Sequence, residues 1–109
     1  MALQRRLPRP RSLLTAAALW LAAPWALSQD ALLARNLAAT CANCHGTNGH
    51  AVGEMKPLAG MAADKIVALV ADFGSGVQDS TVMHQMAKCY TTEQIRLIAE
   101  YFAAQPAGR

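Results

Sequence analysis

The sequence has 109 residues and a formal net charge of +3, and this length sets an upper limit of one domain. Four of the ten basic residues, Arg5, Arg6, Arg9 and Arg11, lie close to the N-terminus, whereas from Gln29 onward six basic residues face seven acidic ones, which gives −1. The composition of this remaining part therefore excludes a basic nucleic-acid-binding face.

The N-terminal segment has the pattern of a secretory signal peptide. A basic run, "RRLPRPR", precedes the apolar run Leu13–Ala23, and Pro24 and the small residues of "ALS" follow. The apolar run is shorter than the roughly 20 residues that span a bilayer, so we expect cleavage and no stable membrane anchor afterwards; retention as an anchor is the alternative. We predict a signal peptide over residues 1–28 and a single domain over residues 29–109.

Two helices are predicted in the first part of this domain. The first is "DALLARNLAATC", with Asp30 as a plausible N-cap and Leu33 and Leu37 four residues apart. The second is "ADKIVALVADFG", in which four apolar side chains recur at helical spacing and two glycines follow. The stripe consists of Ile66, Leu69, Val70 and Phe73.

A third helix is predicted over "TTEQIRLIAEYFAAQ", where Thr91 followed by Gln94 makes a capping box. Its apolar stripe is Ile95, Ile98, Ala99 and Phe102. The segment "GTNGHAVGEMKPLAG" is expected to be loop, and "SGVQDSTVMHQMAKCY" to contain at most a short helical turn. No run alternates as a strand does, so the fold class is all-α, and a domain of about 80 residues needs a disulfide, a metal or a cofactor to complete its core.

The stretch "CANCHG" carries the most specific signal in the chain. Cys41, Cys44 and His45 form a Cys-x-x-Cys-His string, which is the attachment signal for haem c. A zinc knuckle would need a second ligand pair, but Cys89, His50 and His84 form none. A thioredoxin-like redox pair would need a βαβ surround, and no strand is predicted here. We therefore predict one covalent haem c, with both thiols joined to the porphyrin and His45 on the iron.

With this motif and its last helix, the chain resembles a class I cytochrome c. The stretches "KPLAG", "VADFGSG" and "STVMHQMAKCYTTEQIRLIAEYF" are similar to the cytochrome subunit of flavocytochrome c sulfide dehydrogenase and to the c4 and c5 cytochromes. The resemblance covers essentially all of residues 31–105. It implies the cytochrome c fold, in which three main helices and long loops wrap one haem.

The resemblance also implies a methionine as the sixth iron ligand, in the segment before the last helix. Met83 matches the ligand of the family pattern; Met86 is the alternative, and His84 is a rival donor beside them. Met55 and Met61 fall instead in the loop that should cover the proximal side, close after the histidine ligand.

Two further positions follow from the comparison with the family pattern. In the family a proline carbonyl accepts the second ring N–H of the histidine ligand, which predicts this role for Pro57. Cys89 stands where the family generally has glycine, so a positive φ there would strain it. We expect a small buried hydrophobic side chain at Cys89; an intermolecular disulfide or a reactive thiol is the alternative.

A haem with both axial positions filled has no vacant place for a substrate, which suits single-electron transfer rather than catalysis. The predicted function is therefore a periplasmic electron-transfer protein, not itself an enzyme, that accepts electrons from a flavoprotein (FAD) subunit which oxidises sulfide. The loops around residues 47–49 and 82–85 are expected to frame the haem edge. A free carrier of the c4, c5 or c553 type is the first alternative, and a haem sensor with an open distal site is the second.

Overall fold

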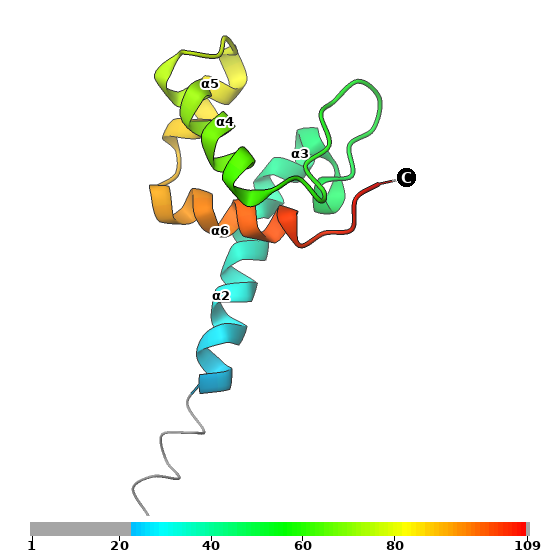
Figure 1. Ribbon diagram of the computed structural model, residues 1–109, viewed down its shortest axis with the longest axis vertical. Coiled ribbons are helices and arrows are strands. Elements are labelled where there is room, and N and C mark those ends of the chain that lie inside the picture. Colours follow the sequence, from blue (N-terminus) through cyan, green and yellow to red (C-terminus); the bar gives the residue numbers. More distant parts are fainter. Residues whose placement is uncertain (1–22, 109) are drawn as a thin grey trace, which may run out of the picture.

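The computed structural model describes residues 23–108, and all regular structure in that range is helical (Figure 1). The prediction of an all-α fold is confirmed. Beyond the three predicted helices, the structure contains α5 and the one-turn helix α3. In chain order the elements are α2 (Ala23–Ala38), η1 (Ala39–Cys41), α3 (Ala42–His45), η2 (Thr47–Gly49), α4 (Ala63–Ser75), α5 (Thr81–Lys88) and α6 (Thr92–Ala103), where η denotes a short 3-10 helix.

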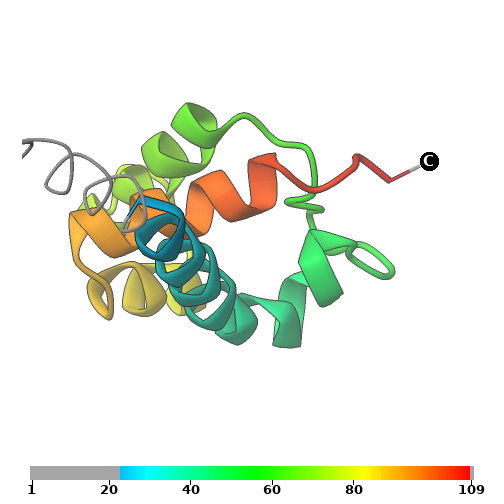
Figure 2. The ribbon, with the colours of Figure 1, turned by 90° about the horizontal axis from the view of Figure 1, so that it is seen from below.

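The last helix, α6, is the centre of the packing. It lies against both α2 and α4, and α4 in turn packs against α5 (Figures 1 and 2). The core between these helices contains Ala38 of α2, Ile66 of α4 and three residues of α6, Ile98, Ala99 and Phe102. Because Ala38 and Ala99 are small, α2 and α6 can approach each other closely.

Helix α6 forms as its sequence predicts. The Thr91 backbone N–H donates to Gln94 Oε1 at 2.9 Å and the Gln94 backbone N–H donates to Thr91 Oγ1 at 3.2 Å, so the predicted capping box is present. Both bonds satisfy N–H groups that the first turn of a helix leaves without partners. The predicted apolar stripe is the buried face of this helix, with Ile95 at its half-buried edge.

Helix α4 confirms the second predicted stripe, of which Ile66 is fully buried and the other three members are half-buried. The helix continues through Gly74 and ends at Gly76, whose left-handed conformation (φ +80°) favours glycine as the C-cap. Gly74 remains inside the helix, and a Cβ atom built there would lie 3.3 Å from the Cβ atom of Ala87 in α5. The missing side chain at Gly74 therefore lets α5 approach α4.

Helix α2 begins at Ala23, so Asp30 lies within the helix and the expectation that it is the N-cap is wrong for this chain. The helix runs continuously across the predicted signal-peptide boundary after Ser28. Residues 1–22 of the predicted signal peptide lie outside the described residues, and the boundary stays a prediction. Within residues 23–108, no helix combines the length and the apolar character needed to cross a membrane.

Helix α5 is longer than the short turn considered possible from the sequence. Ser80 is its N-cap, because the Ser80 Oγ accepts a hydrogen bond from the Met83 backbone N–H at 3.2 Å. The helix packs on α4, and this contact over many residues is a tertiary effect that the local pattern of the sequence does not contain.

Candidate functional site

The Cys-x-x-Cys-His string forms a compact helical segment at the end of α2. Cys41 is the last residue of η1, and Cys44 and His45 are in α3. Since residues three apart on a helix lie on one face, the two thiols are on the same side of this segment. Cys41 is half-buried and packs against the core, Cys44 is exposed, and His45 is half-buried.

The two thiols differ in their surroundings. Burial raises the pKa of the Cys41 thiol above its ordinary value, and the neighbouring Cys44 raises it further, while a backbone hydrogen bond opposes the shift. Cys41 is therefore held in its neutral thiol form at pH 7.

Directly after His45, the chain reverses at a glycine that no other residue can replace without movement. Gly46 has φ +79°, and a Cβ atom built there would lie 2.0 Å from the carbonyl oxygen of His50. The Gly46 carbonyl accepts the Gly49 backbone N–H at 3.0 Å, which closes η2. This turn fixes the direction in which the chain leaves the histidine.

The loop that follows is closed by hydrogen bonds at its two ends. The Gly49 carbonyl accepts the backbone N–H groups of Leu58 at 2.9 Å and Ala59 at 3.1 Å. Gly49 is buried, and a Cβ atom there would lie 2.9 Å from Cδ1 of Phe102. The loop thus leaves and returns at one point on the core, and Lys56, which lies in this loop, contacts His45 through its carbonyl oxygen.

The His45 ring is oriented by this loop. Its Nδ1 lies 2.7 Å from the carbonyl oxygen of Lys56. A carbonyl only accepts, so Nδ1 carries the proton at this contact and Nε2 keeps a free lone pair. An imidazole with this tautomer is prepared to bind a metal through Nε2.

The acceptor differs from the predicted one by one residue: the structure places the Lys56 carbonyl at the ring, and not that of Pro57. The two remain connected, because the Lys56 carbonyl belongs to the peptide bond that ends in the Pro57 nitrogen. A proline restricts the residue before it to extended conformations, so Pro57 still limits where this carbonyl points.

On the other side of the molecule, α5 carries both candidate thioethers. Met83 and Met86 are half-buried on this helix. The rival donor between them has both ring nitrogens engaged: His84 Nδ1 lies 2.8 Å from the Phe73 carbonyl oxygen, and Nε2 lies 2.7 Å from Lys88 Nζ. Since a carbonyl only accepts and an ammonium only donates, His84 has no lone pair left for a metal in this arrangement.

The two groups of candidate ligands lie apart. Helix α3 packs against η1 and η2, whereas α5 packs against α4, and the views in Figures 1 and 2 place α3 and α5 on different sides of the helical assembly. The donor set fits a haem c: a pair of thiols and a free imidazole nitrogen on α3 and η1, and thioether sulfurs on α5. No group of three or more His, Cys, Asp or Glu side chains gathers as a metal site within residues 23–108, so the zinc alternative finds no ligand set there.

The expectation of a small buried side chain at Cys89 is wrong, and the strain that a positive φ would cause does not arise, whereas the alternative of an intermolecular disulfide or a reactive thiol stays a prediction. Cys89 is the C-cap of α5 with φ −80°, an ordinary conformation without backbone strain. Its side chain is exposed and not buried, with Sγ 3.5 Å from the Gln85 carbonyl oxygen. The histidine in the first loop, His50, is exposed, and Met61 packs against the core, whereas Met55 is exposed.

Sequence reasoning missed two features near the site. One is Lys56, whose role depends on the path of the loop and leaves no signal in the sequence. The other is Tyr101, whose hydroxyl donates to Asn48 Oδ1 and so ties α6 to η2. Asn48 has φ +55°, a conformation in which asparagine is enriched, and this preference was the available clue.

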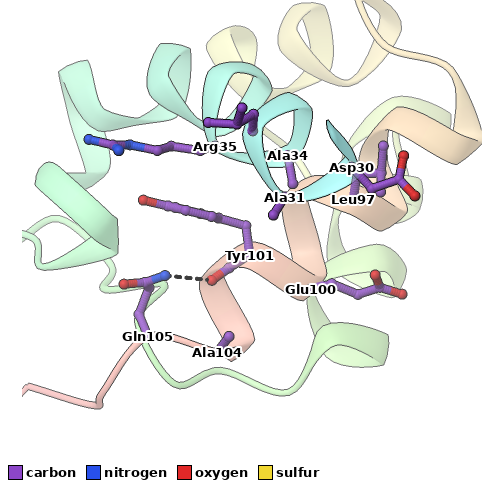
Figure 3. Close-up of a pocket in the computed structure, with 10 residues that line it drawn as sticks. Asp30, Ala31, Ala34, Arg35, Leu97, Glu100, Tyr101, Ala104 and Gln105 are labelled. Carbon is purple, nitrogen blue, oxygen red and sulfur yellow. Dashed lines mark hydrogen bonds between the residues drawn. The ribbon is translucent and has the colours of Figure 1, made fainter. Parts of the chain in front are cut away.

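A groove of about 530 Å³ between α2 and α6 contains none of the predicted site residues (Figure 3). Arg35 of α2 and Tyr101 of α6 face each other across it, and Gln105 Nε2 donates to the Tyr101 carbonyl at 3.0 Å. The groove therefore belongs to the contact between α2 and α6, and none of the haem-binding residues predicted from the sequence lines it.

Comparison with known proteins gives two relatives, both cytochromes. The chain is 44% identical over 66 residues to the cytochrome subunit of sulfide dehydrogenase from Chlorobaculum tepidum, covering 61% of this chain and 60% of the relative. It is 33% identical over 64 residues to cytochrome c-552 from Acidithiobacillus ferridurans, covering 59% of this chain and 28% of the relative. No family model matches the chain.

The aligned part therefore spans 60% of the length of the first relative and 28% of the second. The resemblance to class I c-type cytochromes, and to the haem subunit of sulfide dehydrogenase in particular, is confirmed by these relatives. Both relatives are cytochromes by name, and each matches this chain over only part of its own length. Cytochromes are haem proteins, so the relatives also agree with the predicted class of cofactor.

Proposed function

We propose that this chain is a monohaem c-type cytochrome that transfers single electrons. In this proposal Cys41 and Cys44 hold the haem covalently, His45 is the fifth iron ligand and Met83 the sixth, with Met86 as the alternative. One observation carries the proposal: the Lys56 carbonyl lies 2.7 Å from His45 Nδ1, which leaves Nε2 free beside the two thiols.

When bound, the haem supplies an iron that changes between Fe(II) and Fe(III) and so carries one electron. The residues of the chain would orient the haem and set its reduction potential. The bond from His45 to the Lys56 carbonyl fixes the orientation and the tautomer of the ring, so that Nε2 is the nitrogen that would face the iron. Met83, or Met86 in its place, would offer the iron a thioether sulfur, a ligand that would raise the reduction potential and suit electron transfer.

We infer further that the chain is exported to the periplasm and receives electrons from a flavoprotein subunit that oxidises sulfide. The N-terminal basic and apolar pattern supports export. The name of the first relative, a subunit of sulfide dehydrogenase, supports the partner. A free carrier is the alternative, for which no flavoprotein would be bound.

The haem proposal is tested on the full chain, expressed in bacteria that mature c-type cytochromes. A pyridine haemochrome spectrum of the c type, with one haem per chain, is expected. The ferric protein should show the far-red absorption band of a sulfur–iron bond. Met83→Leu should abolish this band and let the reduced protein bind carbon monoxide, while the matched Met86→Leu should change neither. The reverse result would assign Met86, and a parent protein without the band that binds carbon monoxide would support the haem sensor.

The partner is tested by purifying the tagged, haem-loaded chain from its own cells. Recovery of an FAD-containing protein in a fixed ratio, together with sulfide-dependent reduction of the haem, is the expected result. Recovery of the cytochrome alone, reduced by sulfide only when other proteins are added, would instead support the free carrier.

A further inference from the structure

Helix α5 presents two distinct faces. Each residue of an α-helix turns the side chain by about 100°, which places the half-buried residues on one arc in the order His84, Ala87, Met83 and Met86. Thr81, Val82, Gln85 and Lys88 are exposed and occupy the opposite arc. The two candidate thioethers are thus neighbours on the buried arc, and His84 lies at its edge.

His84 connects this edge of α5 to the end of α4. Its Nδ1–H donates to the Phe73 carbonyl at 2.8 Å, and its Nε2 accepts from the Lys88 ammonium at 2.7 Å. The Lys88 contact keeps the ring in the tautomer with the proton on Nδ1, because an ammonium group has no lone pair to offer. Lys88 is one helical turn further along α5, so the ring is held from both helices.

The Phe73 carbonyl is well suited to accept this bond. It lies in the last turn of α4, where carbonyl groups lack partners within the helix and carry the negative end of the helix dipole. It also accepts the Gly76 backbone N–H at 3.3 Å, and a carbonyl has two lone pairs. The His84 Nδ1–H donates to the second lone pair of this carbonyl, and the positive charge of Lys88 at Nε2 strengthens the bond.

A second contact on the same arc of α5 also joins this helix to α4. Ala87 lies one turn from His84, and its Cβ atom lies 3.3 Å from the place where a side chain at Gly74 would begin. Within the broader contact between α4 and α5, these two interactions one turn apart constrain both the distance of α5 from α4 and the rotation of α5 about its axis. The directions of Met83 and Met86 are set by this rotation.

The geometry points to His84 as a positioning residue for the sixth iron ligand: by bridging the Phe73 carbonyl and Lys88, it fixes the rotation of α5 that aims its methionines. This inference rests on the proposed function. His84 contributes no electron pair to the iron and acts through the helix. Without it, α5 keeps its Ala87 contact but can rotate, and the thioether leaves the iron more often.

The test measures how readily imidazole from solution replaces the methionine in the ferric, haem-loaded protein. In His84→Leu, which removes both contacts of the ring, imidazole should bind roughly five- to tenfold more tightly, since a hydrogen bond of ordinary net strength is lost from the methionine-bound state. His84→Gln keeps a donor and an acceptor and should restore most of the parent affinity. His50→Leu is the matched control, because it removes an exposed histidine from another part of the chain and should leave the affinity unchanged.

Urea unfolding of the same samples separates positioning from general stability. An unchanged imidazole affinity in His84→Leu, with easier unfolding, would overturn the inference, because His84 would then only support the fold. If His84→Leu does not fold, Lys88→Leu removes the contact to His84 Nε2 at an exposed residue without adding a thioether; tighter imidazole binding supports the inference and an unchanged affinity overturns it. A parent protein without the far-red sulfur–iron band would refute the methionine ligand itself, and this result is seen before any His84 variant is compared.

Discussion

Two regions of the molecule are built in different ways. The packed region, formed by α2, α4 and α6, contains the buried cluster of Ala38, Ile66, Ile98, Ala99 and Phe102. The site region, formed by residues 39–61 and α5, has only Gly49 and Ala59 as buried residues. Its shape is set by individual hydrogen bonds to His45, Gly49 and His84.

The difference shows how the chain divides stability from function. Burial of apolar side chains gives the packed region its stability, and this term depends on area rather than on the direction of any one group. The site region holds particular atoms in particular directions, and Met83, Met86 and Cys41 remain only half-buried there. Such side chains are available to contact a large apolar cofactor, which would complete the burial that a chain of this size lacks.

The largest expected effect breaks the packed region. Phe102 is 1% exposed and is the largest fully buried side chain among the described residues, so Phe102→Ala should lower the free energy of unfolding by about 3–5 kcal/mol. Leu33→Ala, at a residue of α2 that is 47% exposed, is the control and should change it by about 0.5 kcal/mol or less. Urea unfolding of the haem-loaded proteins measures both. Equal losses would show that the packed region does not rest on this cluster.

A smaller effect is expected from the turn after His45. Gly46→Ala and Gly53→Ala both place a side chain at positive φ, which costs on the order of 1–2 kcal/mol. Only Gly46→Ala also meets backbone, since nothing lies within 4 Å of a Cβ atom at Gly53. Gly46→Ala should therefore lower the free energy of unfolding more than Gly53→Ala does, which urea unfolding measures. It should also lower the haem content, because the turn no longer holds His45 in place for the iron. A loss no greater than that of Gly53→Ala would mean that the turn is free to adjust.

The smallest effect concerns the thiols of the haem-free chain. Folding raises the pKa of the Cys41 thiol, so the neutral thiol contributes to the free energy of unfolding. This contribution is fully present below the ordinary thiol pKa and is lost as the pH rises through the raised pKa. Cys41 should accordingly react with iodoacetamide more slowly than the exposed Cys89 at pH 8, and catch up as the pH rises or when urea is added. Mass spectrometry of the digested protein measures each site. Equal rates at pH 8 would contradict the burial of Cys41.

The parts of the fold that follow local rules could be predicted from the sequence. The capping box at Thr91 and the stripes around Ile66 and Phe102 are set by spacing along one helix, so they require no knowledge of neighbours. From the sequence, α5 could be predicted only as a possible turn, because the helix is stabilised by its packing against α4, which the local sequence does not reveal. The start of α2 at Ala23 could not be predicted, because Asp30 is a residue type that often caps helices and so indicated a later start.

The candidate site divides in the same way. The string from Cys41 to His45 is local and specific, so haem attachment could be proposed from the sequence alone, and it stays a prediction. The acceptor for His45 was assigned to Pro57, one residue from Lys56, because the direction of a carbonyl depends on the torsions of the whole loop. His84 Nδ1 contacts the carbonyl of Phe73, eleven residues away along the chain, and no local pattern indicates this contact.

The continuity of α2 across Ser28 and Gln29 has a consequence for maturation. Proteases act on segments that can leave regular structure, so a signal peptidase could cut at this point only if the first turns of the helix were unwound. The shortened chain would then start its helix near Asp30, whose carboxylate would stand beside the positive end of the new helix. Asp30, which lies in the middle of α2 in the uncut chain, would thus stabilise the start of a helix only if the chain were cut.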